Sequence, residues 1–181
     1  LSGSPSKDNI YQKVLQTCLT YLKDEQEEDG SWFGRWGTNY IYGTWSVLIA
    51  LEEAGISGDD PLMQKATIWL KSKQREDGGW GESNDSYADI SSSGQALRST
   101  SFQTAWALLG LMAAGEGNTI EVERGIDFLL SSQIPSGLWE DEEFTSPGFP
   151  RIFYLKYHGY DKYFPLWALA RYKSLLSAGS M

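Results

Sequence analysis

Apolar residues recur at the spacing of an amphipathic helix in three stretches of the chain, residues 10–26, 62–74 and about 121–133. The first stretch carries its apolar positions at Ile10, Val14, Leu15, Leu19 and Leu22. Each stretch also has a polar side. We therefore expect three helices that bury one face and expose the other.

Two further stretches, residues 44–53 and 100–114, are apolar around most of their circumference, and glycines at 55 and 115 follow them. A helix without a polar side is buried, and glycine ends helices by adopting a positive φ. Residues 165–176 form a sixth predicted helix. Polar-sided and apolar helices thus alternate three times, which predicts an all-α fold: an α/α barrel or toroid of inner and outer helices, about half of which is present.

The segments between these helices lack a helical period. Residues 81–99 are rich in Ser, Gly and Asp and are predicted to be a loop, as are residues 140–149. The aromatic stretch at residues 150–160 is expected to be helical in part.

A short repeated phrase follows each polar-sided helix. In every copy a Leu lies four residues before a Gln, a Gly four residues after it and a Trp six residues after it. The copies are Leu22-Gln26-Gly30-Trp32, Leu70-Gln74-Gly78-Trp80 and Leu129-Gln133-Gly137-Trp139. We expect the Gln to reach unpaired backbone groups at the helix end, the Gly to stop the helix and the Trp ring to cover the Leu. Each copy is predicted to clasp one helical hairpin to the next.

Composition and net charge limit the classes of function that the chain can have. A length of 181 residues suffices for one domain with a hydrophobic core. The formal net charge of −9 argues against nucleic acid as a partner. The chain holds 8 Trp and 10 Tyr, and so many rings must serve packing, stacking or the lining of a cavity. No apolar run approaches the ~18 residues that cross a bilayer.

No metal or cofactor site is predicted. Cys18 is the single cysteine and is expected to be a small buried residue, and His158 is the single histidine. The acidic runs at residues 24–29 and 140–143 are expected to be solvated, because no calcium-loop pattern surrounds them.

One long segment resembles the squalene–hopene cyclase family. It reads Gly30-Ser31-Trp32-Phe33-Gly34-Arg35-Trp36-Gly37-Thr38-Asn39-Tyr40-Ile41-Tyr42-Gly43-Thr44. The three phrases are similar to the Gln-Trp repeats of that family. The resemblance continues, in the family's order, through residues 78–82, 101–108, 148–150, 153–157, 164–165 and 170–173. The eukaryotic oxidosqualene cyclases carry Cys where this chain has Asn39, so the bacterial enzymes are more similar.

The resemblance implies a class II terpene cyclase, which protonates a terminal alkene and folds a linear polyene such as squalene into fused rings without a metal or cofactor. The initiating acid of the family lies in an Asp-x-Asp-Asp motif in an earlier part of the enzyme, and no segment of this chain matches it. Residues 10–177 are therefore expected to be the C-terminal half of the barrel domain, inactive without the missing N-terminal part. The family also implies peripheral or monotopic attachment to the cytoplasmic side of a membrane, with this piece soluble.

By the same resemblance, one set of aromatic residues matches family positions that line the cavity: Trp80, Phe149, Phe153, Tyr157 and Tyr160. Aromatic faces attract a carbocation by up to ~2 kcal/mol in a dry site and are poor nucleophiles. The alternative is that these rings are ordinary core. The hypothesis requires the rings of Phe149 to Tyr157 to face a chamber and not open water.

A second set, Asn39, Tyr40 and Tyr42, lies in the loop that approaches the catalytic acid in the family. A hydrogen-bond donor there would stabilise a carboxylate and tune its acidity. The alternative is a turn residue and two packing rings.

Other functions remain open from the residues. An α/α repeat could bind an isoprenoid or a protein without catalysis, and a glycan-processing α/α barrel could use the acids at 140–143. Protein prenyltransferase β-subunits share the hairpin repeat but need zinc ligands, and His158 has no partner for such a site.

The ends and edges of the chain add two expectations. Residues 1–9 are predicted to be a linker or cloning remnant and residues 178–181 a tail, so the chain is expected to be an excerpt. An α/α array that stops before the ring of helices closes leaves an apolar flank exposed. We therefore predict that the isolated chain is marginally stable or forms a homodimer.

Overall fold

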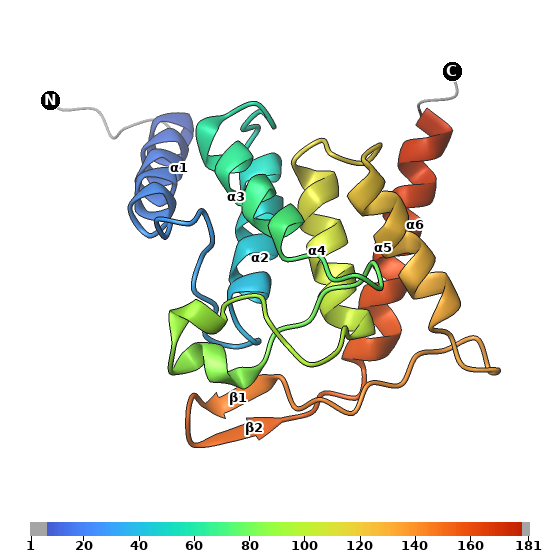
Figure 1. The fold of residues 1–181 in the computed structure, drawn as a ribbon. Helices are drawn as coiled ribbons and strands as arrows, with labels where there is room; N and C mark the ends of the chain where they lie inside the picture. Colours follow the sequence, from blue (N-terminus) through green and yellow to red (C-terminus); the bar gives the residue numbers. More distant parts are fainter. Residues whose placement is uncertain (1–6, 179–181) are drawn as a thin grey trace, which may run out of the picture.

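The computed structural model describes residues 7–178, so most of the predicted linker and tail lies outside the described residues. Residues 7–9 and 178 belong to helices, which places the predicted domain limits at 10 and 177 inside helices. The fold is built from six helices within the described residues (Figure 1): α1 Lys7–Asp24, α2 Tyr40–Glu53, α3 Pro61–Ser72, α4 Ser101–Ala113, α5 Ile120–Ser131 and α6 Tyr160–Ala178.

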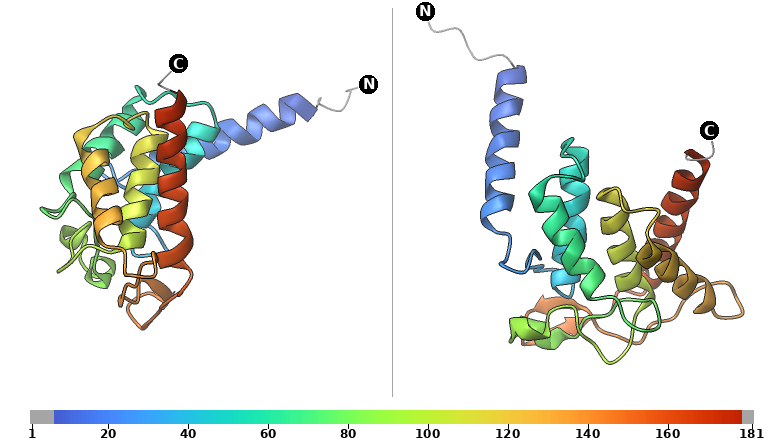
Figure 2. Two further views of the ribbon diagram at one scale, coloured as in Figure 1. Left: turned by 90° about the vertical axis from the view of Figure 1, so that its right-hand side faces the viewer. Right: turned by 45° about the horizontal axis from the view of Figure 1, so that its top comes forward.

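The inner helices α2 and α4 form the centre of the fold. Every residue of α4 is buried, and this helix packs against α2, α5 and α6. Figure 2 shows α4 between α5 on one side and α6 on the other. The polar-sided helices α3 and α5 lie outside α2 and α4, as the alternation of patterns predicted. The loop at residues 81–99 contains two short 3-10 turns, η1 Asn84–Tyr87 and η2 Ile90–Ser92.

Residues 146–155 form a β-hairpin, where the sequence pattern predicted a loop followed by partial helix. Strand β1 (Ser146–Phe149) pairs antiparallel with β2 (Phe153–Leu155). Prolines at 147 and 150 disfavour a helix across this segment. Arg151 closes the turn with a φ of 67°, which is the left-handed region that few side chains adopt.

Helix α6 begins at Tyr160, five residues before the Pro165 that was predicted to start it. Proline inside the helix removes one backbone hydrogen bond. The rings of Tyr160 and Phe164 compensate by packing on Trp106 of α4, at centroid distances of 5.7 and 5.4 Å.

Both ends of the array expose apolar side chains. Helix α1 extends away from the other helices (Figure 2), and its residues Ile10, Tyr11 and Val14 are exposed. Cys18 on this helix is also exposed, so its predicted burial is wrong, because no described element covers that side of α1. On α6, Leu166 is 64% exposed. These surfaces fit the open flank that the sequence predicted. No described helix is both long enough and apolar enough to cross a membrane.

Candidate functional site

The three repeat phrases form clasps at the ends of the outer helices. In each clasp the Trp indole N–H donates to the carbonyl of the repeat Leu: Trp32 to Leu22 at 2.7 Å, Trp80 to Leu70 at 2.8 Å and Trp139 to Leu129 at 2.8 Å. The Trp, and not the Gln, therefore satisfies the helix-end carbonyl.

The glycines of the phrases do not stop the helices. Helices α1, α3 and α5 end two residues before the repeat Gln, whereas the glycines at 30, 78 and 137 come four residues after it. All three adopt a positive φ, of 101°, 86° and 80°. They belong to the tight turn that brings the Trp back over the helix end, so the predicted stop role is wrong.

The glutamines link successive outer helices. Gln26 donates to the carbonyls of Gly30 and Leu62, both at 3.0 Å. Gln74 donates to Gly78 at 2.9 Å and to Glu121 at 2.7 Å. Leu62 and Glu121 are each the second residue of the next outer helix.

The third clasp is incomplete among the described residues. Gln133 donates to Gly137 at 2.9 Å, and no further partner is seen in residues 7–178. Two of the three clasps thus lie at junctions between hairpins, as predicted, and the third lies at the end of α5, the last outer helix among the described residues.

A buried acid that the sequence analysis missed holds the start of α2. Glu82 is buried, and its carboxylate accepts hydrogen bonds from the backbone N–H groups of Asn39 (3.0 Å), Tyr40 (3.1 Å) and Ile41 (2.8 Å). Asp141 does the same at α4, where it accepts from the N–H of Ser101 at 2.9 Å. Each acid lies two residues after a repeat Trp, and this spacing is the signal that could have found both.

Burial is the main cause of the raised pKa values of the acids and of Tyr40 in this region. It raises the pKa of Glu82, against the opposing effect of the three backbone donors. Burial also raises the pKa of Asp141. The pKa of Tyr40 rises to about 12 through burial, with smaller contributions from the charges of Glu27, Glu82 and Asp29.

Of the three residues predicted to lie in a loop, Asn39 is the N-cap of α2, and Tyr40 and Tyr42 belong to its first turn. The Asn39 Oδ1 accepts from the Gly34 N–H at 3.0 Å. Its Nδ2 is buried and has no partner among the described residues. Tyr40 packs edge-on against Phe33, and Tyr42 packs against Trp106 at 5.1 Å. Of the three residues, Asn39 is the one with a buried side-chain donor that has no partner among the described residues.

An aromatic cluster joins α2, α4 and α6. Its rings contact one another in a continuous set: Tyr42, Trp45, Phe102, Trp106, Tyr157, Tyr160, Tyr163, Phe164 and Trp167. Of the predicted cavity residues, Tyr157 and Tyr160 belong to it. The sequence analysis missed Trp106 and Phe164 at its centre. Their helical spacing from Phe102 and Tyr160, four residues in each case, was the available signal.

The other predicted cavity residues lie elsewhere. Phe149 and Phe153 form a separate ring pair on the hairpin, 5.6 Å apart. Phe149 is 59% exposed, Phe153 44% and, within the cluster, Tyr157 51%. These rings face open solvent, so the chain alone does not meet the condition that they face a chamber. Trp80 is fully buried. The added Cβ of an alanine at position 125 would come within 2.8 Å of its ring, which shows how closely α5 packs on it.

Three of the acids at 140–143 make contacts within the fold. Arg98 pairs with Glu142 at 3.1 Å and also with Glu143, while Asp141 holds α4. Among the described residues no group of His, Cys, Asp and Glu could hold a metal ion.

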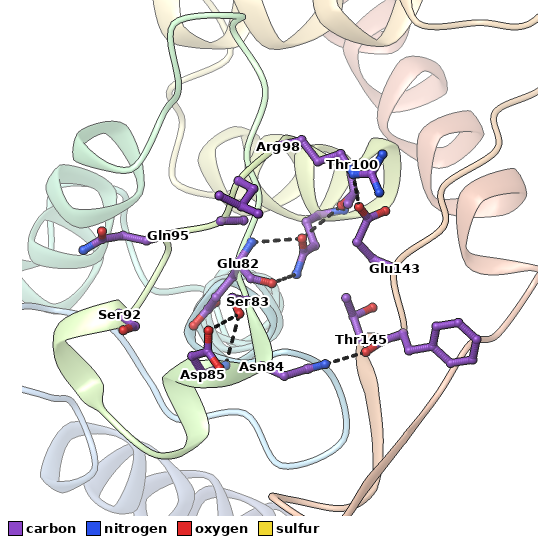
Figure 3. A pocket seen from close by; sticks show the side chains of 14 residues that line it. Glu82, Ser83, Asn84, Asp85, Ser92, Gln95, Arg98, Thr100, Glu143 and Thr145 are labelled. Carbon is purple, nitrogen blue, oxygen red and sulfur yellow. Dashed lines mark hydrogen bonds and ion pairs between the residues drawn. The ribbon is translucent and has the colours of Figure 1, made fainter.

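A polar pocket of about 540 Å³ lies between the 82–100 loop and residues 143–145. Figure 3 shows Glu82, Asn84, Arg98 and Thr145 around it. The aromatic residue in its described lining is Phe144, which does not belong to the aromatic cluster. Its wall includes the network that holds α2, because Gln103 donates to the carbonyls of Thr38 (3.2 Å) and Glu82 (3.1 Å).

Helical hairpins joined by Gln–Trp clasps, with an aromatic cluster on the inner layer, place the chain in the α/α fold of the terpene cyclases. Two solved structures share this fold. The ent-copalyl diphosphate synthase of Streptomyces platensis has a TM-score of 0.64 and 24% identity, over 91% of this chain and 29% of that chain. The type II terpene cyclase MstE of Scytonema, in complex with merosterolic acid A, has a TM-score of 0.62 and 18% identity, over 88% of this chain and 49% of that chain.

Within that class, the chain belongs to the family described as the squalene-hopene cyclase C-terminal domain, whose sequence model matches residues 4–174. The squalene–hopene cyclase of Zymomonas mobilis is 58% identical over 94% of this chain and 26% of its own length. The squalene–hopene cyclase of Alicyclobacillus acidocaldarius is 46% identical over 96% and 27%. The dammaradiene synthase of Dryopteris crassirhizoma is 44% identical over 90% and 26%. The chain therefore spans about a quarter of the length of these relatives.

Proposed function

We propose that residues 10–177 contribute part of the cavity wall of a squalene–hopene-type cyclase, which cyclises a linear polyene such as squalene by protonation and cation–olefin addition. The observation that carries the proposal is the aromatic cluster across α2, α4 and α6. Such rings hold an apolar chain and stabilise a carbocation without trapping it.

The same proposal gives roles to individual residues. Tyr160 and Tyr157 lie in the cluster, and both would face the cations once the remaining part of the enzyme covers the exposed Tyr157 ring. Phe149 and Phe153 are exposed on the adjacent hairpin, and docking of the remaining part of the enzyme would enclose them. Trp80 serves the second clasp from within the core.

The initiating acid would come from that remaining part, since no Asp-x-Asp-Asp motif occurs in this chain. The family resemblance places the segment with Asn39, Tyr40 and Tyr42 near that acid, where a hydrogen-bond donor would favour its ionised form. Membrane attachment of the complete enzyme rests on the family resemblance.

A chimera tests this function. The upstream part of the Zymomonas mobilis squalene–hopene cyclase would be joined to this chain in place of its matching C-terminal segment. We expect the chimera to convert squalene to polycyclic products, detected by gas chromatography with mass spectrometry, and the isolated chain to give none. A chimera that melts cooperatively and forms no product would contradict the proposal.

The exposed apolar flank favours a second candidate, a non-catalytic module that binds an isoprenoid or a protein. Titration of the isolated chain with squalene in detergent micelles separates the two. Saturable binding by the isolated chain, together with an inactive folded chimera, would favour the binding module.

A further inference from the structure

The first two clasps bind the next outer helix at its second residue. Gln26 and Gln74 each use both N–H groups of the side-chain amide. One N–H donates to the glycine carbonyl of the same clasp. The other donates to the backbone carbonyl of Leu62 in α3 or of Glu121 in α5. The two junctions therefore share one hydrogen-bonding arrangement.

The fifth residue of the next outer helix makes a second contact in both junctions. Lys65 of α3 donates through Nζ to the carbonyl of Glu27 at 3.3 Å. Arg124 of α5 donates to the carbonyl of Arg75 at 3.0 Å. Glu27 and Arg75 each directly follow the clasp glutamine. A basic residue at the fifth position thus reaches the same carbonyl of each clasp.

The clasp glycine also lies against the backbone of that fifth residue. A Cβ at Gly30 would come within 2.5 Å of the Lys65 carbonyl oxygen. A Cβ at Gly78 would come within 2.6 Å of the Arg124 carbonyl oxygen. Only glycine permits so close an approach between two backbones. The clasp turn is therefore fitted to the first five residues of a helix.

The third clasp has the same turn, but no helix among residues 7–178 lies on it. Its backbone hydrogen bonds match those of the other two, because the Ile134 N–H donates to Leu138 and the Gly137 N–H to Ile134. One N–H of the exposed Gln133 amide donates to Gly137, which leaves the other open to a partner. A Cβ at Gly137 would meet no described atom within 4 Å, its two chain neighbours aside.

The side chains around the third clasp differ in character from those around the second. Four positions of the third clasp are apolar: Leu130, Ile134, Pro135 and Leu138. The matching positions of the second clasp hold charged residues or glycine: Lys71, Arg75, Glu76 and Gly79. Leu130 is 53% exposed and Leu138 46%. Clustered exposed apolar side chains mark interaction sites, so this clasp is suited to being covered.

We propose that the third clasp is the docking site for the first five residues of one more outer helix, supplied by the remaining part of the enzyme. The Gln133 amide binds the backbone carbonyl of the second residue of that helix. Its fifth residue is a Lys or Arg that donates to the Ile134 carbonyl. The chain spans about a quarter of the length of its relatives, which leaves room for such a helix. The inference rests on the proposed function, in which the remaining part completes the cavity wall.

Alanine at position 137 tests the docking in the chimera with the upstream part of the Zymomonas mobilis enzyme. In the isolated chain, Gly137→Ala is strained by its positive φ alone. In the chimera the added Cβ would also strike the docked backbone, so we expect the melting midpoint to fall about as much as in Gly78→Ala. Gly115→Ala is the matched control, because Gly115 also has a positive φ and open surroundings. Equal losses for Gly137→Ala in the chimera and the isolated chain would overturn the inference.

Gln133→Ala gives an independent measurement. In the isolated chain it removes one hydrogen bond within its own turn, so its effect should be small. In the chimera it also removes the bond to the docked helix, and we expect a loss of melting midpoint similar to that of Gln74→Ala. A loss that stays as small as in the isolated chain would contradict the docking.

A photo-activated cross-linking residue at Ser136, the exposed neighbour of Gly137, identifies the occupant. Mass spectrometry of the digested chimera should place the cross-link at the start of a helix in the upstream part, with Lys or Arg as its fifth residue. A cross-link to a second copy of the chain, or none above background, would overturn the inference.

A chimera that does not fold leaves a second route, in which the upstream part is supplied as a separate chain. Calorimetric titration should show binding that Gly137→Ala and Gln133→Ala each weaken about 10-fold, and that Gly115→Ala changes less than about twofold. No binding, or equal binding by all variants, would overturn the inference. The two proposals fail separately, because squalene conversion tests the proposed function, whereas melting, cross-linking and binding require no turnover.

Discussion

Trp45 of α2 and Trp106 of α4 lie with their rings nearly parallel, 6.3 Å apart between centroids and 9° apart in plane. Both indole N–H groups are buried and unpaired among the described residues. Hydrogen bonding therefore does not fix these rings, unlike the clasp tryptophans. Contact between ring faces and edges sets the spacing of the two inner helices, and the aromatic cluster is built around this pair.

Removing the central ring should strongly destabilise the chain. Trp106 is fully buried, so Trp106→Ala leaves a large cavity and is expected to cost about 3–5 kcal/mol of unfolding free energy. Urea denaturation followed by circular dichroism measures this. Trp36→Ala is the control, because Trp36 is exposed, and its effect should stay within about 0.5 kcal/mol. Equal effects of the two would refute a central role for Trp106.

The clasp glutamines should differ in importance. Gln74→Ala removes a hydrogen bond to the next outer helix, whereas Gln133→Ala removes only one within its own turn. We expect Gln74→Ala to cost about 1–3 kcal/mol, because it removes hydrogen bonds to two partly buried carbonyls, and Gln133→Ala clearly less. Chemical denaturation of the isolated variants makes the comparison, and a larger loss in Gln133→Ala would contradict it.

The turn glycines allow a second matched pair. Gly78 and Gly137 both have positive φ, so alanine at either site is strained by about 1–2 kcal/mol. A Cβ at position 78 would also lie 2.6 Å from the Arg124 carbonyl oxygen, while position 137 is open. Gly78→Ala should therefore lower the thermal midpoint more than Gly137→Ala. The prediction fails if the two midpoints coincide.

Stability should fall at alkaline pH. The folded state raises the Tyr40 pKa from 10.0 to about 12, and burial raises that of Tyr87 as well. Unfolded tyrosines lose their protons near pH 10 while the folded ones keep them, so the folded state loses stability as pH rises from 10 to 12. Thermal melts across this range check the slope. Tyr40→Phe keeps the ring and should reduce the loss; an unchanged slope would argue against Tyr40.

The exposed apolar side chains of α6 should drive self-association of the isolated chain. Leu166 on α6 and Ile68 on α3 are similarly exposed, at 64% and 67%, but only Leu166 borders the aromatic cluster. We expect association that increases with concentration, measured by light scattering after size exclusion, to be removed by Leu166→Lys and retained in Ile68→Lys. A wild-type chain that is monomeric at every concentration would show the prediction to be wrong.

Local sequence was sufficient for the repeats and for most helices. The spacing of Leu, Gln, Gly and Trp predicted the clasps, and two of them join hairpins as expected. The same local reasoning failed at residues 150–160, where prolines and a left-handed Arg151 form a hairpin turn. It also failed at Pro165, because packing on Trp106 outweighs the cost of proline inside α6.

By itself the sequence determined the alternation of polar-sided and apolar helices and the clasp turns, because helical period and turn chemistry depend on residues within about ten positions of one another. Only the tertiary structure decided that Glu82 caps α2, that Asn39 is left with an unpaired donor, and that rings from α2, α4 and α6 meet. Those contacts join residues 40 or more positions apart, and their geometry follows from how whole helices pack.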